Sequence, residues 1–119
     1  MNQNTFATEI YRAVDSKDID GILSFLTHDA HFRFANIPGA KGKDNIRDFL
    51  SAFYPTIKSI KHADLESWFT DGVCFINGNV TYVRPDDFSL NVPFGVLLRL
   101  NGDLIKEWLI FVDNSALYK

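Results

Sequence analysis

Several features that would narrow the function are missing from this sequence. It has one cysteine, Cys74, which excludes an internal disulfide and a multi-cysteine zinc site. No apolar run approaches the roughly 20 residues that a membrane span needs, and the N-terminus lacks the basic-then-apolar pattern of a signal peptide. These absences predict a cytoplasmic protein with no membrane partner.

The chain also lacks an excess of basic residues. It has 12 Lys and Arg against 15 Asp and Glu, a net charge of −3 and a pI near 5.5. A protein that binds nucleic acid through its phosphates needs a basic surface to neutralise them. The charge balance therefore predicts no nucleic-acid partner.

Bulky apolar side chains, in contrast, are plentiful. Of the 119 residues, 46% are hydrophobic and 14% are aromatic, which places the chain in the range of globular proteins. This length suits one ordinary domain and is too short for two. We predict a single domain over residues 1–119.

Helical periodicity dominates the first half of the sequence. Apolar residues recur at spacings of three and four after Thr5, Asp18 and Asp44, each of which has a side chain able to cap a helix. Pro55 falls inside the third pattern, so that helix is expected to end or kink near Tyr54. Three amphipathic helices are predicted.

A turn at residues 27–29 is expected to precede a short strand, residues 30–35, in which Phe32 and Phe34 point the same way. After Ile57 the apolar period changes to two. This change predicts four more strands and a C-terminal tail, over residues 59–69, 73–84, 88–100, 105–113 and 114–119.

Glycine positions define the expected connections. Asp71-Gly72 and Asn101-Gly102 are strong hairpin dipeptides. Asn77-Gly78 has the same form, but a turn there would leave only residues 73–76 as a strand. We therefore interpret Gly78 as a bulge or bend within a long strand.

Helices followed by hairpin-linked strands indicate an α+β fold rather than alternating βαβ units. A strongly twisted antiparallel sheet curls, and helices packed on its concave face enclose a cone-shaped space. The predicted architecture is three N-terminal helices packed on a strongly curved, mostly antiparallel sheet.

The order of these elements, together with several short sequence segments, resembles the cystatin/NTF2-like superfamily, and within it the SnoaL-like group. The resemblance covers nearly the whole chain. It is carried by Asp18-Ile19-Asp20-Gly21-Ile22, Asp29-Ala30-His31-Phe32, Gly42-Lys43-Asp44-Asn45-Ile46, Val80-Thr81-Tyr82-Val83-Arg84 and Trp108-Leu109-Ile110-Phe111-Val112-Asp113. Since this fold serves unrelated functions, the resemblance implies the architecture rather than a chemistry.

The catalytic residues of the better-known enzymes of this superfamily do not match here. The resemblance places Phe34, Ile10 and Val96 where ketosteroid isomerases have their base and oxyanion-binding residues, with Tyr11 one step away. Ile110 falls where limonene-epoxide hydrolases have an aspartate. Because an apolar side chain cannot move a proton, those two activities are not expected with this machinery.

Strand alternation, together with the resemblance, predicts a largely apolar pocket with few polar groups. Such a pocket suits a small hydrophobic molecule that carries one acceptor or anionic group. No cofactor is predicted. The predicted ligand-binding residues are Tyr11, Phe34, Asn36, Tyr82, Arg84, Val96, Trp108 and Ile110.

Three functions remain open from the sequence. The first is binding of a small hydrophobic molecule. The second is an isomerase, cyclase or hydrolase in which Tyr82 is the acid and Arg84 the electrostatic stabiliser. A purely structural interpretation competes with both, because Tyr82 and Trp108 can be core residues and Arg84 can pair with neighbouring aspartates.

The third function is a protein-interaction module that uses the outer face of the sheet. Glu107, Leu109 and Phe111 share the face of the last strand opposite Trp108. Apolar residues on both faces suggest that the outer one is also covered. We predict a homodimer through this face.

Clusters of other reactive residues have simpler explanations. His28, Asp29 and His31 offer metal-ligand types, but neighbours in a turn and strand point apart, so no metal site is predicted. Cys74 is expected to be a buried, inert thiol, and Asp113 to anchor the tail.

A further set alternates along the strand at residues 59–69. His62, Asp64 and Glu66 would lie on one face, which would suit a proton relay in a cleft. A solvated strand face explains them more simply, and we expect that arrangement.

Overall fold

The frame of the molecule is one curved sheet of six strands, in the order β2-β1-β6-β5-β4-β3. The structure is a computed structural model and describes residues 3–118. All neighbouring strands are antiparallel except β1 and β6, which are parallel. The strands are β1 (Leu26–Phe34), β2 (Ala40–Lys41), β3 (Ser59–Thr70), β4 (Val73–Val83), β5 (Ser89–Asn101) and β6 (Leu104–Val112).

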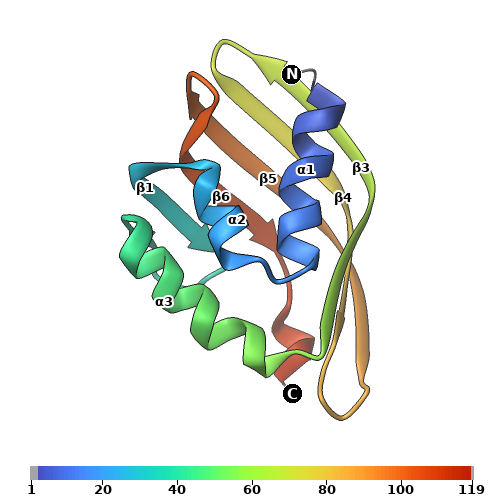
Figure 1. Cartoon of the computed structure of the whole chain (residues 1–119). Helices are drawn as coiled ribbons and strands as arrows, with labels where there is room; N and C mark the ends of the chain where they lie inside the picture. Colours follow the sequence, from blue (N-terminus) through green and yellow to red (C-terminus); the bar gives the residue numbers. More distant parts are fainter. Residues whose placement is uncertain (1–2, 119) are drawn as a thin grey trace.

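Helices lie on the concave side of this sheet (Figure 1). They are α1 (Gln3–Asp15), α2 (Ile19–Ser24), α3 (Lys43–Phe53) and the short 3-10 helices η1 (Tyr54–Thr56) and η2 (Ser115–Tyr118). The predicted α+β class and curved antiparallel sheet are confirmed. The three α-helices do not form one N-terminal block, however, because β1 and β2 separate α2 from α3. None of the described helices is long and apolar enough to cross a membrane.

Helix starts were predicted with mixed success. The Asp18 carboxylate accepts a hydrogen bond from the Gly21 amide and caps α2, as expected. The prediction that Asp44 caps α3 is wrong, because Gly42 is the N-cap and Asp44 lies in the first turn. Gly42 has φ 86°, a conformation that side chains other than glycine rarely adopt. Thr5 lies inside α1, which begins at Gln3, so it is not the cap either.

The first strand is longer than predicted. β1 starts at Leu26, so residues 27–29 are strand and not a turn. Leu26 and residues 31–34 pair with β6. His31 and Phe32 also pair with the two residues of β2, a short strand that was not predicted from the sequence. Pairing with partners distant in sequence therefore extends this strand beyond its local pattern.

The segments at the two hairpins agree well with the prediction. Asp71 and Gly72 both have positive φ, 43° and 76°, as a two-residue primed turn requires. Gly102 has φ 62° in the turn between β5 and β6. The expected tail is the 3-10 helix η2, where Asp113 accepts hydrogen bonds from the Ser115 amide and hydroxyl, so Asp113 anchors this segment as predicted.

Gly78 lies within one long strand, as predicted, but the bulge is on the neighbouring strand. The β3–β4 register shifts between Ala63 and Glu66, where Asp64 has φ 57°. A Cβ atom at position 78 would lie 2.5 Å from the Ala63 carbonyl oxygen. Glycine at position 78 therefore allows the bulged backbone of β3 to approach β4 closely.

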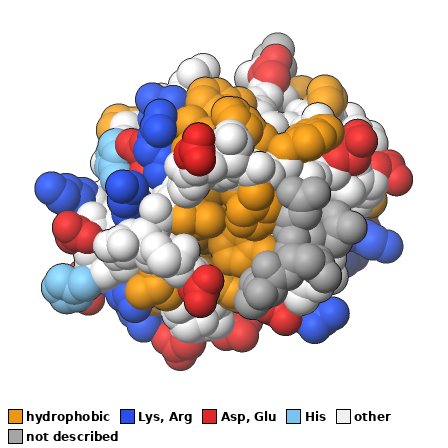
Figure 2. Space-filling view, turned by 90° about the horizontal axis from the view of Figure 1, so that it is seen from above, with side chains coloured by type: hydrophobic (Ala, Val, Ile, Leu, Met, Phe, Trp, Pro, Cys, Tyr) orange, Lys and Arg blue, Asp and Glu red, His pale blue; other side chains and the backbone are white. Residues whose placement is uncertain are grey.

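Part of the hydrophobic core lies at the end of the sheet near the N-terminus. Phe6 of α1 contacts Phe69 of β3, with ring centroids 5.6 Å apart. Phe69 pairs in register with Cys74, and Cys74 with Leu98, both of which are fully buried. Viewed from this end, hydrophobic side chains gather in the middle of the molecule (Figure 2). Cys74 is a buried free thiol, as predicted, and burial raises its pKa to about 11.

The convex face of the sheet carries exposed aromatic side chains. Trp68 of β3, Phe75 of β4 and Phe111 of β6 are 49%, 48% and 52% exposed. Strand register places Trp68, Phe75, Leu97 and Leu109 in one row across four strands. We call Trp68, Phe75, Leu97, Leu109 and Phe111 the outer strip.

Candidate functional site

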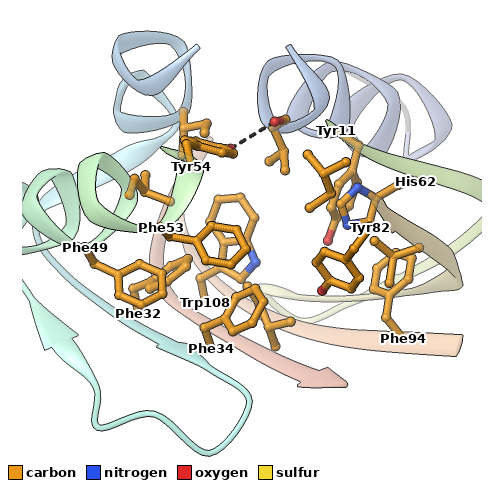
Figure 3. A pocket seen from close by; sticks show the side chains of 16 residues that line it. Tyr11, Phe32, Phe34, Phe49, Phe53, Tyr54, His62, Tyr82, Phe94 and Trp108 are labelled. Carbon is orange, nitrogen blue, oxygen red and sulfur yellow. Dashed lines mark hydrogen bonds between the residues drawn. The ribbon is translucent and has the colours of Figure 1, made fainter. Parts of the chain in front are cut away.

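A cavity lies between the concave face of the sheet and the helices (Figure 3). The enclosed part has a volume of about 40 Å³, within an empty space of about 530 Å³ that includes the opening to solvent. The lining residues are Tyr11, Val14, Ile22, Phe32, Phe34, Phe49, Leu50, Phe53, Tyr54, Ile60, His62, Val80, Tyr82, Phe94, Trp108 and Ile110.

Most of the lining residues contributed by the sheet follow from the alternation of side chains between the two faces of each strand. On β6, Trp108 and Ile110 point inward, paired with Phe32 and Phe34 of the parallel neighbour β1. On β4, Tyr82 shares the same face. The period-two pattern of the sequence predicted this part of the wall.

Aromatic rings form one side of the cavity and contact each other directly. Phe34 lies 5.2 Å from Phe53 between ring centroids, and Phe53 stacks with Phe49 at 5.9 Å. Phe32 meets Trp108 edge to face at 5.7 Å. Such contacts favour an aromatic or other flat apolar molecule over a polar one.

Two buried hydrogen-bond donors in this wall have no partner among the described residues. They are the Tyr11 hydroxyl and the Trp108 indole Nε1, whose residues are 4% and 2% exposed. An unsatisfied buried donor costs roughly 1–3 kcal/mol. Figure 3 shows both atoms directed toward the middle of the cavity, so a bound acceptor can satisfy them.

The three tyrosines of the wall remain protonated donors at neutral pH. Burial raises the pKa of Tyr11 well above its ordinary value, and the nearby Asp15 charge raises it further. Burial, with a smaller contribution from Tyr118, raises the pKa of Tyr82. Tyr54 also has a raised pKa, from burial and then Asp15, and its hydroxyl donates to the Val14 carbonyl at 2.9 Å.

His62 is the one histidine in the cavity wall. Its Nδ1 lies 2.6 Å from the Asp15 Oδ1, and its backbone amide donates to the Asp15 Oδ2 at 2.9 Å. The His62 ring packs 4.3 Å from the Tyr11 ring and 4.8 Å from the Phe94 ring. Its side chain is 8% exposed.

The prediction that His62 lies on a solvated face with Asp64 and Glu66 is therefore wrong. His62 pairs with Val80, an inward residue, whereas after the bulge Glu66 pairs with Asn77 and lies on the opposite face. The extra residue between them reverses the alternation. Sequence reasoning noted both a proton-relay pattern and a bulge signal at Gly78, but did not connect them.

Five of the eight predicted ligand-binding residues line the cavity. They are Tyr11, Phe34, Tyr82, Trp108 and Ile110.

Asn36, Val96 and Arg84 are not in the wall. Asn36 is in the turn after β1, and Val96 is a buried core residue.

Arg84 is engaged at the β4–β5 turn instead. Its Nε and Nη2 donate to the two carboxylate oxygens of Asp86 at 3.0 and 2.7 Å, and Nη1 donates to the Leu117 carbonyl at 3.1 Å. The guanidinium also lies 4.4 Å from the centre of the Phe88 ring. Of the two interpretations from the sequence, this geometry favours the structural one, in which Arg84 pairs with a neighbouring aspartate.

Metal ligation finds no support in the geometry. No group of three or more His, Cys, Asp or Glu residues within residues 3–118 is arranged to hold a metal ion. His31 instead lies 3.5 Å from Glu107 on the convex face, and Arg99 donates to the same carboxylate.

Comparison with known proteins identifies the fold. The family model of the SnoaL-like domain matches residues 7–108. An NTF2-like protein of unknown function from Burkholderia pseudomallei is 17% identical, with 98% of this chain and 95% of that chain covered and a TM-score of 0.87. No curated protein gives a significant match.

Two further solved structures have the same fold. A protein with a ketosteroid isomerase-like fold from Catenulispora acidiphila, in complex with trimethylamine, is 14% identical, with 98% and 91% of the two chains covered and a TM-score of 0.87. TerC, co-crystallised with polyporic acid, is 15% identical, with 97% and 94% covered and a TM-score of 0.85.

Proposed function

Since this chain belongs to the SnoaL-like domain family, we propose that its cavity binds a small aromatic molecule that carries an oxygen acceptor. The observation that supports this most directly is the pair of unpartnered donors, Tyr11 and Trp108, in an otherwise apolar wall. A buried donor without a partner is rare in folded proteins, so each one needs an explanation. TerC, which has this fold, was co-crystallised with a small organic molecule, polyporic acid.

The size of the cavity limits the ligand. Its volume of about 40 Å³ is well below the roughly 150 Å³ of a cavity that holds benzene, so a single ring enters only when the lining side chains move apart. Phe34, Phe49 and Phe53 contact one another and provide the apolar surface for that ring. The acceptor oxygen is then held by the Tyr11 hydroxyl and the Trp108 indole.

Two ligands of similar shape test this proposal. Acetophenone has a carbonyl acceptor and ethylbenzene has none, so titration calorimetry should show tighter binding of acetophenone. In NMR spectra the indole N–H signal of Trp108, assigned by its persistence in Trp68→Phe, should move downfield with acetophenone. Absence of binding by both ligands would overturn the proposal.

A matched pair of tyrosine variants locates the acceptor. Tyr11→Phe should weaken acetophenone binding by up to about tenfold, the worth of one neutral hydrogen bond, and leave ethylbenzene binding unchanged. Tyr54→Phe is the control, because its hydroxyl already donates to Val14. Equal effects of the two substitutions would argue against the assigned acceptor position.

A second proposal concerns the outer strip, which we propose binds a second copy of the chain. Three exposed aromatics in one region are unusual for a free surface. Beside them Arg99 is paired with Glu107, and the Arg33 guanidinium lies 5.7 Å from the centre of the Phe111 ring, so these charged groups are already in contact with side chains of the same chain. A two-fold contact would place apolar strip on apolar strip.

Light scattering coupled to size exclusion tests the dimer. Wild type should elute at twice the 13.6 kDa chain mass, and Leu109→Glu should elute as a monomer. Ser89→Glu adds the same charge on β5 away from the outer strip and should remain a dimer. A monomeric wild type would contradict the proposal.

A further inference from the structure

We infer that the cavity takes phenols and binds them as phenolates, with the hydroxyl proton passing to Nε2 of His62. This inference rests on the proposed ligand-binding function and deepens it by naming the chemical class of the ligand. It assigns His62 as the proton acceptor and Asp15 as the residue that positions it.

The tautomer of His62 is determined by its neighbour. A carboxylate can only accept hydrogen bonds, so the nitrogen 2.6 Å from Asp15, Nδ1, carries a proton. In the neutral ring Nε2 is then the basic nitrogen with a free lone pair. The second hydrogen bond, from the His62 amide to the other Asp15 oxygen, fixes the carboxylate against the ring.

Burial makes this pair unlike an ordinary surface contact. The His62 side chain is 8% exposed and Asp15 is 24% exposed, so the carboxylate keeps contact with solvent while the ring faces the cavity. Because Asp15 occupies Nδ1, Nε2 is the ring nitrogen left to take a proton. The pair is therefore built to accept a proton from something bound beside the ring.

Other titratable groups around the ring do not compete for that proton. Tyr11 on α1, Tyr54 on η1 and Tyr82 on β4 have raised pKa values, and so does Cys74 on β4. All four stay neutral where histidine ordinarily exchanges its proton. Among residues 3–118, Asp15 is the one carboxylate paired with the ring.

The two unpartnered donors stabilise the product of the transfer. The Tyr11 ring lies against the His62 ring, and Trp108 faces them across the cavity (Figure 3). A phenolate oxygen can accept hydrogen bonds from the Tyr11 hydroxyl, the Trp108 indole and the new Nε2–H. Fixed donors in a dry site stabilise an oxyanion more strongly than they do in water.

The step balances without any other reactant. The phenol O–H bond breaks, its electron pair stays on oxygen, and the Nε2 lone pair forms the N–H bond. Before the transfer the site holds one negative charge, on Asp15. After it the site holds two negative charges and the imidazolium, so its net charge is unchanged.

The probe is 4-nitrophenol, whose phenolate absorbs visible light and whose phenol form does not. About one unit below its pKa in solution, roughly a tenth of free 4-nitrophenol is ionised. With saturating wild-type protein at that pH, more than half should absorb as phenolate. In His62→Gln the bound probe should return to the phenol form.

Asp15→Asn tests the positioning role separately. Its amide still reaches His62 but no longer supplies a charge, so the pH at which bound 4-nitrophenol ionises should rise by about one unit or more. His31→Gln is the control, because His31 pairs with Glu107 on the convex face. This variant should bind and ionise the probe as wild type does.

The outcomes separate this inference from the proposed function. If acetophenone binds wild type but 4-nitrophenol binds only as the phenol, the inference fails and the binding function stands. If neither binds, the binding function fails. Ionisation that persists in a folded His62→Gln also overturns the inference.

If a His62 variant does not fold, the inference can still be tested by a measurement on the wild-type protein. Long-range ¹H–¹⁵N spectra should show His62 as the Nδ1–H tautomer without ligand and as the imidazolium with 4-nitrophenol. The ether 4-nitroanisole, which has no proton to give, should leave the ring neutral. A ring that stays neutral with 4-nitrophenol would contradict the inference.

Discussion

The two faces of the sheet have similar side chains in different surroundings. Trp108 on the concave face is 2% exposed and Phe111, three residues later on the convex face, is 52% exposed. Each face also has a histidine beside a carboxylate, His62 with Asp15 at 2.6 Å and His31 with Glu107 at 3.5 Å. Composition therefore does not distinguish the candidate site from the surface; the helices that cover one face do.

This difference matters for electrostatics. The His31 side chain is 46% exposed, and an ion pair in such a position contributes little because water screens it. His62 is nearly dry, so the charge of its partner acts at close range with little screening. The same two residue types are thus a surface contact on one face and a candidate proton acceptor on the other.

The largest expected effect tests how well the concave face is sealed. At pH 8, Cys74 in native protein should react with iodoacetamide more than 100-fold more slowly than in urea. The pKa of about 11 leaves about 0.1% of the thiol as thiolate at this pH, and the thiol is also inaccessible.

Mass spectrometry of timed samples measures this rate, with Cys74→Ser as the blank. Because burial raises the pKa of this group, the protection is present below the pKa of the unfolded thiol. It is lost as pH rises through the folded value. Complete labelling of native protein at the unfolded rate would show that the core is open.

A pair of glycines compares the two faces in terms of packing. Gly78→Ala should lower the free energy of unfolding by about 2 kcal/mol, since its Cβ would meet the Ala63 backbone at 2.5 Å. Gly95→Ala should change it by less than about 0.5 kcal/mol, because nothing lies within 4 Å of the added atom. Urea denaturation measures both, and similar losses would contradict the tight contact at the bulge.

Much of the fold could be predicted from local sequence signals. The hairpins at Gly72 and Gly102 depend on backbone conformations that few residues adopt, so their dipeptides are specific. The helix end near Tyr54 follows in the same way from Pro55. Alternation also predicted that Tyr82 and Trp108 face inward.

The key side chain of the candidate site could not be predicted in that way. The expected face of each side chain follows from its position along the strand. One extra residue in β3 therefore moves every later side chain of that strand to the opposite face. The bulge is visible only as a register shift against β4, which depends on a partner strand. The partnership of His62 with Asp15 spans 47 positions and arises from the packing of α1 on β3.

Arg84 illustrates a choice that the sequence left open, between a ligand-binding charge and a pair with a neighbouring aspartate. Its position after an inward-facing strand suggested a charge at the mouth of the cavity. The Asp86 carboxylate, two residues later, accepts a hydrogen bond from Nη2 of Arg84 at the turn. Nη1 of Arg84 donates to the Leu117 carbonyl in η2. A hydrogen-bond partner within the same tight turn is already close to the side chain, so the side chain points toward that partner and not toward the cavity.

The smallest expected effect compares two tyrosine hydroxyls inside the cavity wall. Tyr54→Phe should lower the free energy of unfolding by about 1 kcal/mol, because it removes a 2.9 Å hydrogen bond to the Val14 carbonyl. Tyr11→Phe should raise it by about 0.5–1 kcal/mol, since the Tyr11 hydroxyl is buried without a partner among the described residues.

The opposite signs are the informative result, and both variants keep the ring and its packing. Urea denaturation of the two proteins without ligand, in parallel with wild type, resolves a difference of this size. A stability loss in Tyr11→Phe equal to that in Tyr54→Phe would mean that the Tyr11 hydroxyl is satisfied in the free protein. In that case the Tyr11 hydroxyl is not available to a ligand, and His62 would be the one remaining observation that distinguishes the concave face as a binding site.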